Sequence, residues 1–74
     1  MPHVNIKHFP VPITEEQERE LVTAVTAAVR NAFGCKEDVV SIALEPVTQD
    51  LWNERVYVPE IVDRQSLLRK TPNY

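Results

Sequence analysis

The feature that most constrains this chain is one long helical pattern, over residues 14–33, with a start signal and a stop signal. Thr14 is followed three residues later by Gln17, which is the spacing of a capping box. The helix dipole favours anions in the first turn, where the sequence has Glu15, Glu16 and Glu18. Apolar residues then recur at helical spacing: Leu21, Val25, Ala28, Val29 and Ala32. Gly34, the only glycine, stands where a left-handed C-terminal cap is favoured, so the pattern predicts a helix over 14–33.

A short strand pattern lies on each side of this helix. Residues 3–9 alternate in part between polar and apolar side chains, with Val4 and Ile6 on the apolar face. Two prolines follow and end this pattern, because proline donates no ladder hydrogen bond. Residues 39–45 are β-branched and mostly apolar, which is typical of a strand buried on both faces. Strand, helix and strand in this order predict a βαβ unit with parallel strands and a right-handed crossover.

The last third of the chain has a weaker pattern that predicts two short helices and a tail. The first helix is expected over residues 48–57, and Pro59 suits the first position of a second helix over residues 59–69. Residues 71–74 read as a terminal tail. The predicted fold class is therefore α+β, with a parallel strand pair, one long helix and C-terminal helical segments, in a single domain over residues 1–74.

The small size of the chain favours assembly with further copies. Its 74 residues lie near the lower limit for a lone hydrophobic core. One cysteine, Cys35, excludes an intrachain disulfide, and no Cys/His cluster has zinc-ligand spacing. Two strands alone do not make a stable sheet. We therefore expect the chain to assemble with a partner chain that extends its sheet.

Charge and hydropathy limit the classes of molecule that this chain is expected to bind. The chain has 8 basic and 11 acidic residues, which disfavours nucleic-acid binding because that needs a cationic face. No apolar run is long enough to span a membrane, and the N-terminus lacks the basic and apolar regions of a signal peptide. One free cysteine fits a reducing compartment. We expect a cytoplasmic protein that binds neither nucleic acid nor membrane.

Pro2 directly follows Met1, and aminopeptidases normally remove Met before a small residue. The mature chain would then begin with a free secondary amine on a strand. A free α-amino group titrates at about 8, and an apolar site or a nearby cation lowers that pKa. An amine with a near-neutral pKa can act as a general base. Many proteins begin with Met-Pro, so it is the small βαβ setting that favours a catalytic Pro2.

Five segments, in this order and at this spacing, carry a resemblance over nearly the whole chain. They are Pro2-His3-Val4-Asn5-Ile6-Lys7, Thr14-Glu15-Glu16-Gln17, Val40-Ser41-Ile42-Ala43-Leu44-Glu45, Trp52 with Val56-Tyr57-Val58-Pro59-Glu60-Ile61, and Leu68-Arg69-Lys70-Thr71-Pro72-Asn73-Tyr74. Together they resemble the tautomerase superfamily. The resemblance is closer to small dimeric tautomerases of the para-phenolpyruvate type (PptA-like) than to 4-oxalocrotonate tautomerase. It implies a β-α-β tautomerase fold and an enol–keto isomerase that needs no cofactor and no metal. It also implies a homodimer whose four-stranded sheet takes two strands from each copy, with a hexamer as the alternative.

The resemblance implies that the Pro2 nitrogen is the general base, which takes a proton from an enol and returns it to carbon. Better-known members carry one arginine after the first strand and another on the second strand. Here residues 9–13 contain no arginine, and Ser41 occupies the second position. Such arginines bind carboxylates and stabilise developing charge. We therefore expect a small 2-oxo acid or enolpyruvate substrate with one carboxylate rather than two.

Five residues are candidates for substrate binding: Lys70, Arg69, Trp52, His3 and Ser41. Lys70 and Arg69 lie in the matched tail, but they could equally be solvated charges at a helix end. Trp52 aligns with an aromatic wall of the family site, and core packing is its alternative role. His3 either binds substrate or is a surface histidine.

Two other functions remain open at this point. Superfamily relatives catalyse decarboxylation or hydratase/dehalogenase-type reactions with a cationic proline as acid, but no convincing set of polar partners for that chemistry is visible. A non-catalytic oligomer with this fold is the other alternative, and the missing arginines favour it.

Overall fold

The computed structural model describes residues 1–74, and these divide into two compact units. The first unit comprises Met1–Ile6 and Val11–Glu45, and the second comprises Lys7–Pro10 and Pro46–Tyr74. The first strand, β1, crosses from one unit to the other. Each unit is described by itself below.

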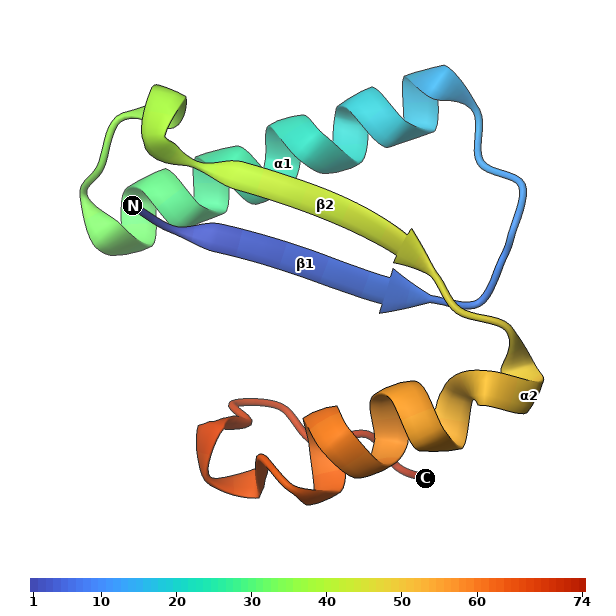
Figure 1. Cartoon of the computed structure of the whole chain (residues 1–74). Coiled ribbons are helices and arrows are strands. Elements are labelled where there is room, and N and C mark those ends of the chain that lie inside the picture. Colours follow the sequence, from blue (N-terminus) through green and yellow to red (C-terminus); the bar gives the residue numbers. More distant parts are fainter. The chain divides into compact units, whose positions relative to one another are not determined.

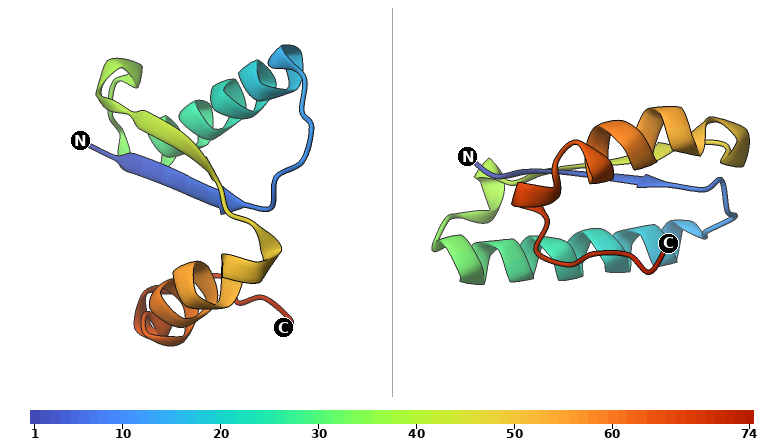
Figure 2. Two further views of the ribbon diagram at one scale, coloured as in Figure 1. Left: turned by 45° about the vertical axis from the view of Figure 1, so that its right-hand side comes forward. Right: turned by 90° about the horizontal axis from the view of Figure 1, so that it is seen from below.

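The first unit is built on the predicted βαβ arrangement. β1 (His3–His8) and β2 (Ser41–Pro46) are hydrogen-bonded neighbours and run parallel, and α1 (Glu15–Phe33) connects them along one face of the pair (Figure 1, Figure 2). Along β1, Val4 and Ile6 are half-buried while His3 and Asn5 are exposed, as the alternation predicts. The parallel strand pair and the long helix confirm the expected α+β class.

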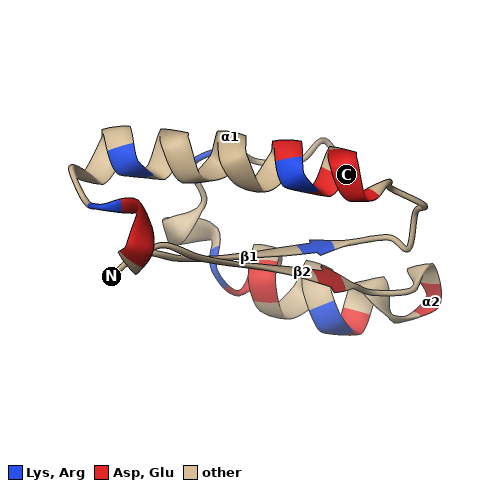
Figure 3. Cartoon of the chain, turned by 90° about the horizontal axis from the view of Figure 1, so that it is seen from above, with Lys and Arg blue, Asp and Glu red and all other residues tan.

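The ends of α1 confirm both sequence signals. The Thr14 hydroxyl accepts the Gln17 N–H at 3.0 Å, and the Gln17 side chain accepts the Thr14 N–H at 2.9 Å, which completes the capping box. At the other end Gly34 has φ 63° and ψ 37°, and its N–H donates to the Arg30 carbonyl at 2.8 Å. Acidic side chains gather at the N-terminal end of the helix (Figure 3). Capping and dipole therefore fix where α1 begins and ends.

The second strand begins two residues later than predicted. A single turn of 3₁₀ helix, η1 (Glu37–Val39), occupies the start of the predicted strand, and the Val40 N–H closes it by donating to the Glu37 carbonyl at 3.1 Å. The expected burial of β2 on both faces is also absent from a single chain, because Ser41 and Glu45 are exposed and the strand's middle is only half-buried. One helix covers only one face of a two-stranded pair.

The second unit corrects the predicted pair of helices. α2 (Gln49–Trp52) runs directly into a π-helix, η2 (Asn53–Val62), and a 3₁₀ turn, η3 (Gln65–Leu67), follows. Pro59 lies inside η2 instead of starting a new helix. In an α-helix its ring would clash with the carbonyl four residues earlier, whereas the wider π turn uses i→i+5 bonds. The Asp63 N–H donates to the Val58 carbonyl at 2.9 Å, five residues back.

The single chain has a very small core. Only Val47 and Val56, both in the second unit, are buried, at 2% and 6% exposure. Large apolar side chains that stay well exposed include Phe9, Val11, Ile13, Phe33 and Leu67. So much exposed apolar surface marks places where a further protein surface can pack. None of the helices combines the length and apolar character needed to cross a bilayer.

Candidate functional site

The N-terminal end of the strand pair holds Pro2 by its backbone. The Ser41 N–H donates to the Pro2 carbonyl oxygen at 3.1 Å. Ser41 is the first residue of β2, so this bond sets the register of β1 against β2 and fixes Pro2 at the start of the sheet. Pro2 is half-buried, whereas Met1 is fully exposed. While Met1 is attached, the Pro2 nitrogen is an amide and has no basicity.

His3 and Ser41 are joined by their side chains. His3 Nδ1 lies 2.6 Å from Ser41 Oγ, across the strand pair, and both side chains are exposed. Ser41 therefore contacts Pro2 through its backbone and His3 through its hydroxyl. The structure thus brings three of the predicted site residues to one place.

Further along the same face, Asn5 donates to Glu45. The Asn5 Nδ2 to Glu45 Oε1 distance is 3.0 Å, again between β1 and β2. Two cross-strand hydrogen bonds between polar side chains therefore lie on this exposed face of the strand pair. Such pairs stabilise a sheet where it faces solvent.

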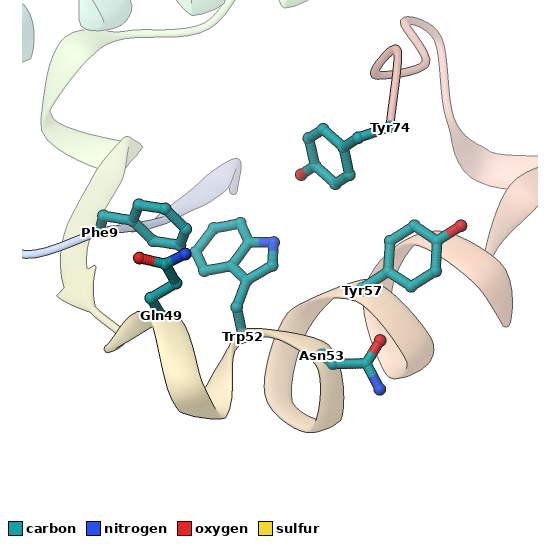
Figure 4. Close-up of a pocket in the computed structure, with 6 residues that line it drawn as sticks. All are labelled: Phe9, Gln49, Trp52, Asn53, Tyr57 and Tyr74. Carbon is teal, nitrogen blue, oxygen red and sulfur yellow. The ribbon is translucent and has the colours of Figure 1, made fainter.

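An aromatic pocket of about 360 Å³ lies in the second unit (Figure 4). Six residues line it: Phe9, Gln49, Trp52, Asn53, Tyr57 and Tyr74. The Phe9 and Trp52 rings meet edge to face with centroids 4.9 Å apart, and the Tyr57 and Tyr74 rings lie 5.9 Å apart at a 40° tilt. The pocket therefore offers ring faces and edges to a flat apolar group.

The polar side chains that line this pocket are amides and phenols. Gln49 and Asn53 have amide side chains, and Tyr57 and Tyr74 have phenolic hydroxyls. These groups donate and accept hydrogen bonds without demanding a counter-charge. The lining suits an aromatic ring with a neutral hydrogen-bonding substituent.

A small ion-pair network in the second unit centres on Glu60. Its two carboxylate oxygens lie 3.5 Å from Lys7 Nζ and 3.3 Å from an Arg64 guanidinium nitrogen. Partial desolvation raises the pKa of the Glu60 carboxyl, but the Arg64 hydrogen bond and the Lys7 charge outweigh it and hold that pKa below its ordinary value. The network connects the end of β1 to η2.

The two tail cations differ in how they are engaged. The Arg69 guanidinium donates to the Ser66 and Leu68 carbonyl oxygens at 3.2 and 3.3 Å, so it folds back on its own segment. Lys70 is exposed and forms no ion pair. Of the two cations, Lys70 is therefore the one whose charged group has no partner within the chain.

Comparison with known proteins gives one consistent result. The family model described as "Tautomerase enzyme" matches residues 2–53. This chain belongs to the tautomerase family. A protein named Tautomerase PptA from Pectobacterium carotovorum is 34% identical over 74 residues, covering 100% of this chain and 97% of that protein. Proteins of the same name from Klebsiella pneumoniae (strain 342) and Escherichia coli O9:H4 are 39% and 31% identical over the same shares.

The tautomerase family and these relatives establish the resemblance read from the sequence, including its PptA-like character, and with it an isomerase of the tautomerase type. The roles of Pro2, His3, Ser41, Trp52, Arg69 and Lys70 in this tautomerase stay predictions.

Sequence reasoning missed most of the pocket of this tautomerase. Gln49, Trp52 and Asn53 share the i, i+3, i+4 spacing of one helix face, which was a usable signal. Tyr57 follows Trp52 by five residues and joins the same face because η2 is a π-helix. Phe9 gave no local signal, since its contact with Trp52 spans most of the chain.

Proposed function

We propose that this tautomerase converts an enol to its keto form, with the Pro2 nitrogen as general base once Met1 is removed. The observation that carries the proposal is the position of Pro2 at the start of the strand pair, bonded to Ser41, in a chain of this family. The matched region of the family model begins at Pro2. The relatives' name, Tautomerase PptA, supports the same activity.

The chemistry needs one nitrogen that can hold a proton briefly. The amine takes the enol O–H proton, the oxygen forms the carbonyl, and the former alkene carbon receives the proton from the same nitrogen. The O–H bond breaks and a C–H bond forms. The proton that leaves the oxygen is the one that the carbon receives, so the step needs no cofactor. The proline ring fixes the direction of the lone pair, which favours a single approach of the substrate.

The substrate class we propose is an aromatic enolpyruvate or a similar small 2-oxo acid. Because Phe9 lies at the opposite end of β1 from Pro2, the pocket around Phe9 and Trp52 would have to meet the Pro2 of another copy, and in that arrangement its rings support an aromatic side chain on the substrate. Trp52 serves as the wall of the pocket in this proposal. Lys70, whose ammonium is unpaired, is the first choice of partner for the single carboxylate, and Arg69 is the second because its guanidinium already has carbonyl partners.

We also propose a homodimer in the cytoplasm. The exposed apolar side chains and the small core support a second copy that covers them. In that dimer each copy contributes two strands to a four-stranded sheet. The single free cysteine, Cys35, fits a reducing compartment.

The direct test is the ketonisation of phenylenolpyruvate, followed by its ultraviolet absorbance. We expect the wild-type chain to accelerate the reaction and Pro2→Ala to lose most of that acceleration. Pro12→Ala is the matched control, because it removes an exposed loop proline and should leave the rate unchanged. Equal rates for the wild type and Pro2→Ala would rule out Pro2 as the base.

A further inference from the structure

The side chain next to the proposed base is not free to rotate. The His3 imidazole is held by Ser41 through a 2.6 Å contact between Nδ1 and Oγ. The same Ser41 fixes the Pro2 carbonyl through its N–H. Ser41 therefore positions both Pro2, which carries the proposed base, and the imidazole ring of His3, the next residue in the sequence.

We propose that His3 and Ser41 work as one hydrogen-bonded couple, in which the Ser41 hydroxyl holds the His3 ring at Nδ1, and the N–H at Nε2 on the other side of the ring stabilises the substrate oxygen. This inference rests on the proposed function and adds a second functional group, the His3 imidazole, to the site of the Pro2 nitrogen. Ser41 is then a positioning residue, and His3 is the residue that contacts the substrate.

Ser41 Oγ lies 2.6 Å from His3 Nδ1, and a hydroxyl can either donate to a ring nitrogen or accept from a ring N–H. In the proposed couple the hydroxyl is the donor and Nδ1 is the acceptor. A neutral imidazole that accepts at Nδ1 carries its hydrogen at Nε2. That N–H lies on the side of the ring away from Ser41, where it is exposed to a ligand.

The reaction needs such a donor. When the base removes the enol proton, negative charge develops on the oxygen, and a donor already aimed at that oxygen lowers the barrier. The oxygen must lie close to the Pro2 nitrogen, because it surrenders its proton to that nitrogen. The His3 ring and the Pro2 carbonyl are both hydrogen-bonded to Ser41, so the ring and the proposed base lie at the same end of the strand pair.

The tautomer can be tested without any assay of activity. His8 provides an internal reference, because its Nδ1 lies 2.7 Å from the Phe9 carbonyl oxygen, which can only accept. His8 must therefore carry a proton on Nδ1. Long-range ¹H–¹⁵N spectra of the neutral rings should show the proton of His3 on Nε2, and Ser41→Ala should remove that preference while His8 stays unchanged. A His3 proton on Nδ1, or a spectrum that Ser41→Ala leaves unaltered, overturns the inference.

Three variants test the catalytic part. His3→Asn keeps an acceptor for Ser41 but lacks the distal donor, so we expect kcat to fall by about tenfold to a hundredfold with little change in KM. His3→Gln reaches further and should recover part of that loss. Ser41→Ala should lower kcat less than His3→Asn does, because the ring remains but is no longer held.

Asn5→Ala is the matched control, since it breaks a cross-strand bond of the same kind, to Glu45, and should leave kcat unchanged. If Pro2→Ala abolishes activity and His3→Asn keeps the wild-type kcat, this inference fails and the proposed function stands. If the wild-type chain does not ketonise the substrate at all, both fail.

Discussion

Phe9 and Trp52 meet edge to face, with ring centroids 4.9 Å apart and ring planes at 82°. One ring follows the first strand and the other ends α2, so a contact between distant parts of the sequence forms the wall of the pocket. Each ring holds the other at the angle that aromatic quadrupoles favour.

Trp52→Ala should therefore weaken substrate binding more than it slows the chemical step. Edge-to-face pairs contribute about 1 kcal/mol beyond the area they bury, so KM for phenylenolpyruvate should rise by roughly fivefold to tenfold while kcat changes less. Phe33→Ala, at an exposed ring that ends α1, is the control and should leave KM unchanged. A wild-type KM in Trp52→Ala would show that substrate does not use this pocket.

Gly34→Ala should destabilise the protein through the backbone alone. Gly34 has φ +63°, and a Cβ there would have no heavy atom within 4 Å, so the change adds no clash. The left-handed conformation itself costs a residue with a Cβ about 1 kcal/mol. Urea unfolding at one fixed protein concentration should show that loss, with a smaller loss for Gly34→Asn. Unchanged stability in Gly34→Ala would contradict the cap.

Glu60→Gln should remove a stabilising contribution that depends on pH. The folded-state pKa of Glu60 lies below its ordinary value of 4.5. Its contribution is therefore complete above that value and is lost as the pH falls through the lower folded-state pKa. The gap in unfolding free energy between wild type and Glu60→Gln should be measurable at neutral pH and should close in acid. Because Glu60 is partly exposed, salt should shrink the gap, and a gap that persists in acid would refute this account.

Gel filtration with light scattering should give a mass near twice the 8.5 kDa of one chain. The reason is the small core, in which only Val47 and Val56 are buried. A mass six times that of the chain would replace the dimer with a hexamer. A stable monomer would contradict the assembly altogether.

The elements that local rules govern were predictable from the sequence, and those that depend on distant contacts were not. Thr14 and Gly34 determine the ends of α1 within the helix itself, so both ends were predicted to within one residue. Pro59 was predicted to start a helix because, inside an α-helix, its ring would clash with the carbonyl four residues earlier. The π turns of η2 avoid that clash, so Pro59 lies inside the helix. The strand register that brings His3 to Ser41 depends on pairing across the sheet, which no local pattern encodes.

Some residues of the candidate site were likewise predictable from the sequence, and others were not. Residue type and position identified Pro2 and its neighbour His3 as candidates, whereas Ser41 and Trp52 were candidates through the resemblance to the tautomerase superfamily. The aromatic partners of Trp52 were not identified, because Phe9 lies at the far end of the chain and Tyr74 is its last residue. Only the folded second unit brings these rings together.

One comparison tests most directly whether a free amine at Pro2 is the base. Two preparations of the same chain are needed, one processed to Pro2 and one with a residue retained before it, each verified by intact mass. Their side chains from Pro2 onward are identical, and only the basicity of the Pro2 nitrogen differs. We predict that the processed chain ketonises phenylenolpyruvate at least about a hundredfold faster, in line with the usual contribution of a general base. Equal kcat/KM values for the two preparations would contradict the account.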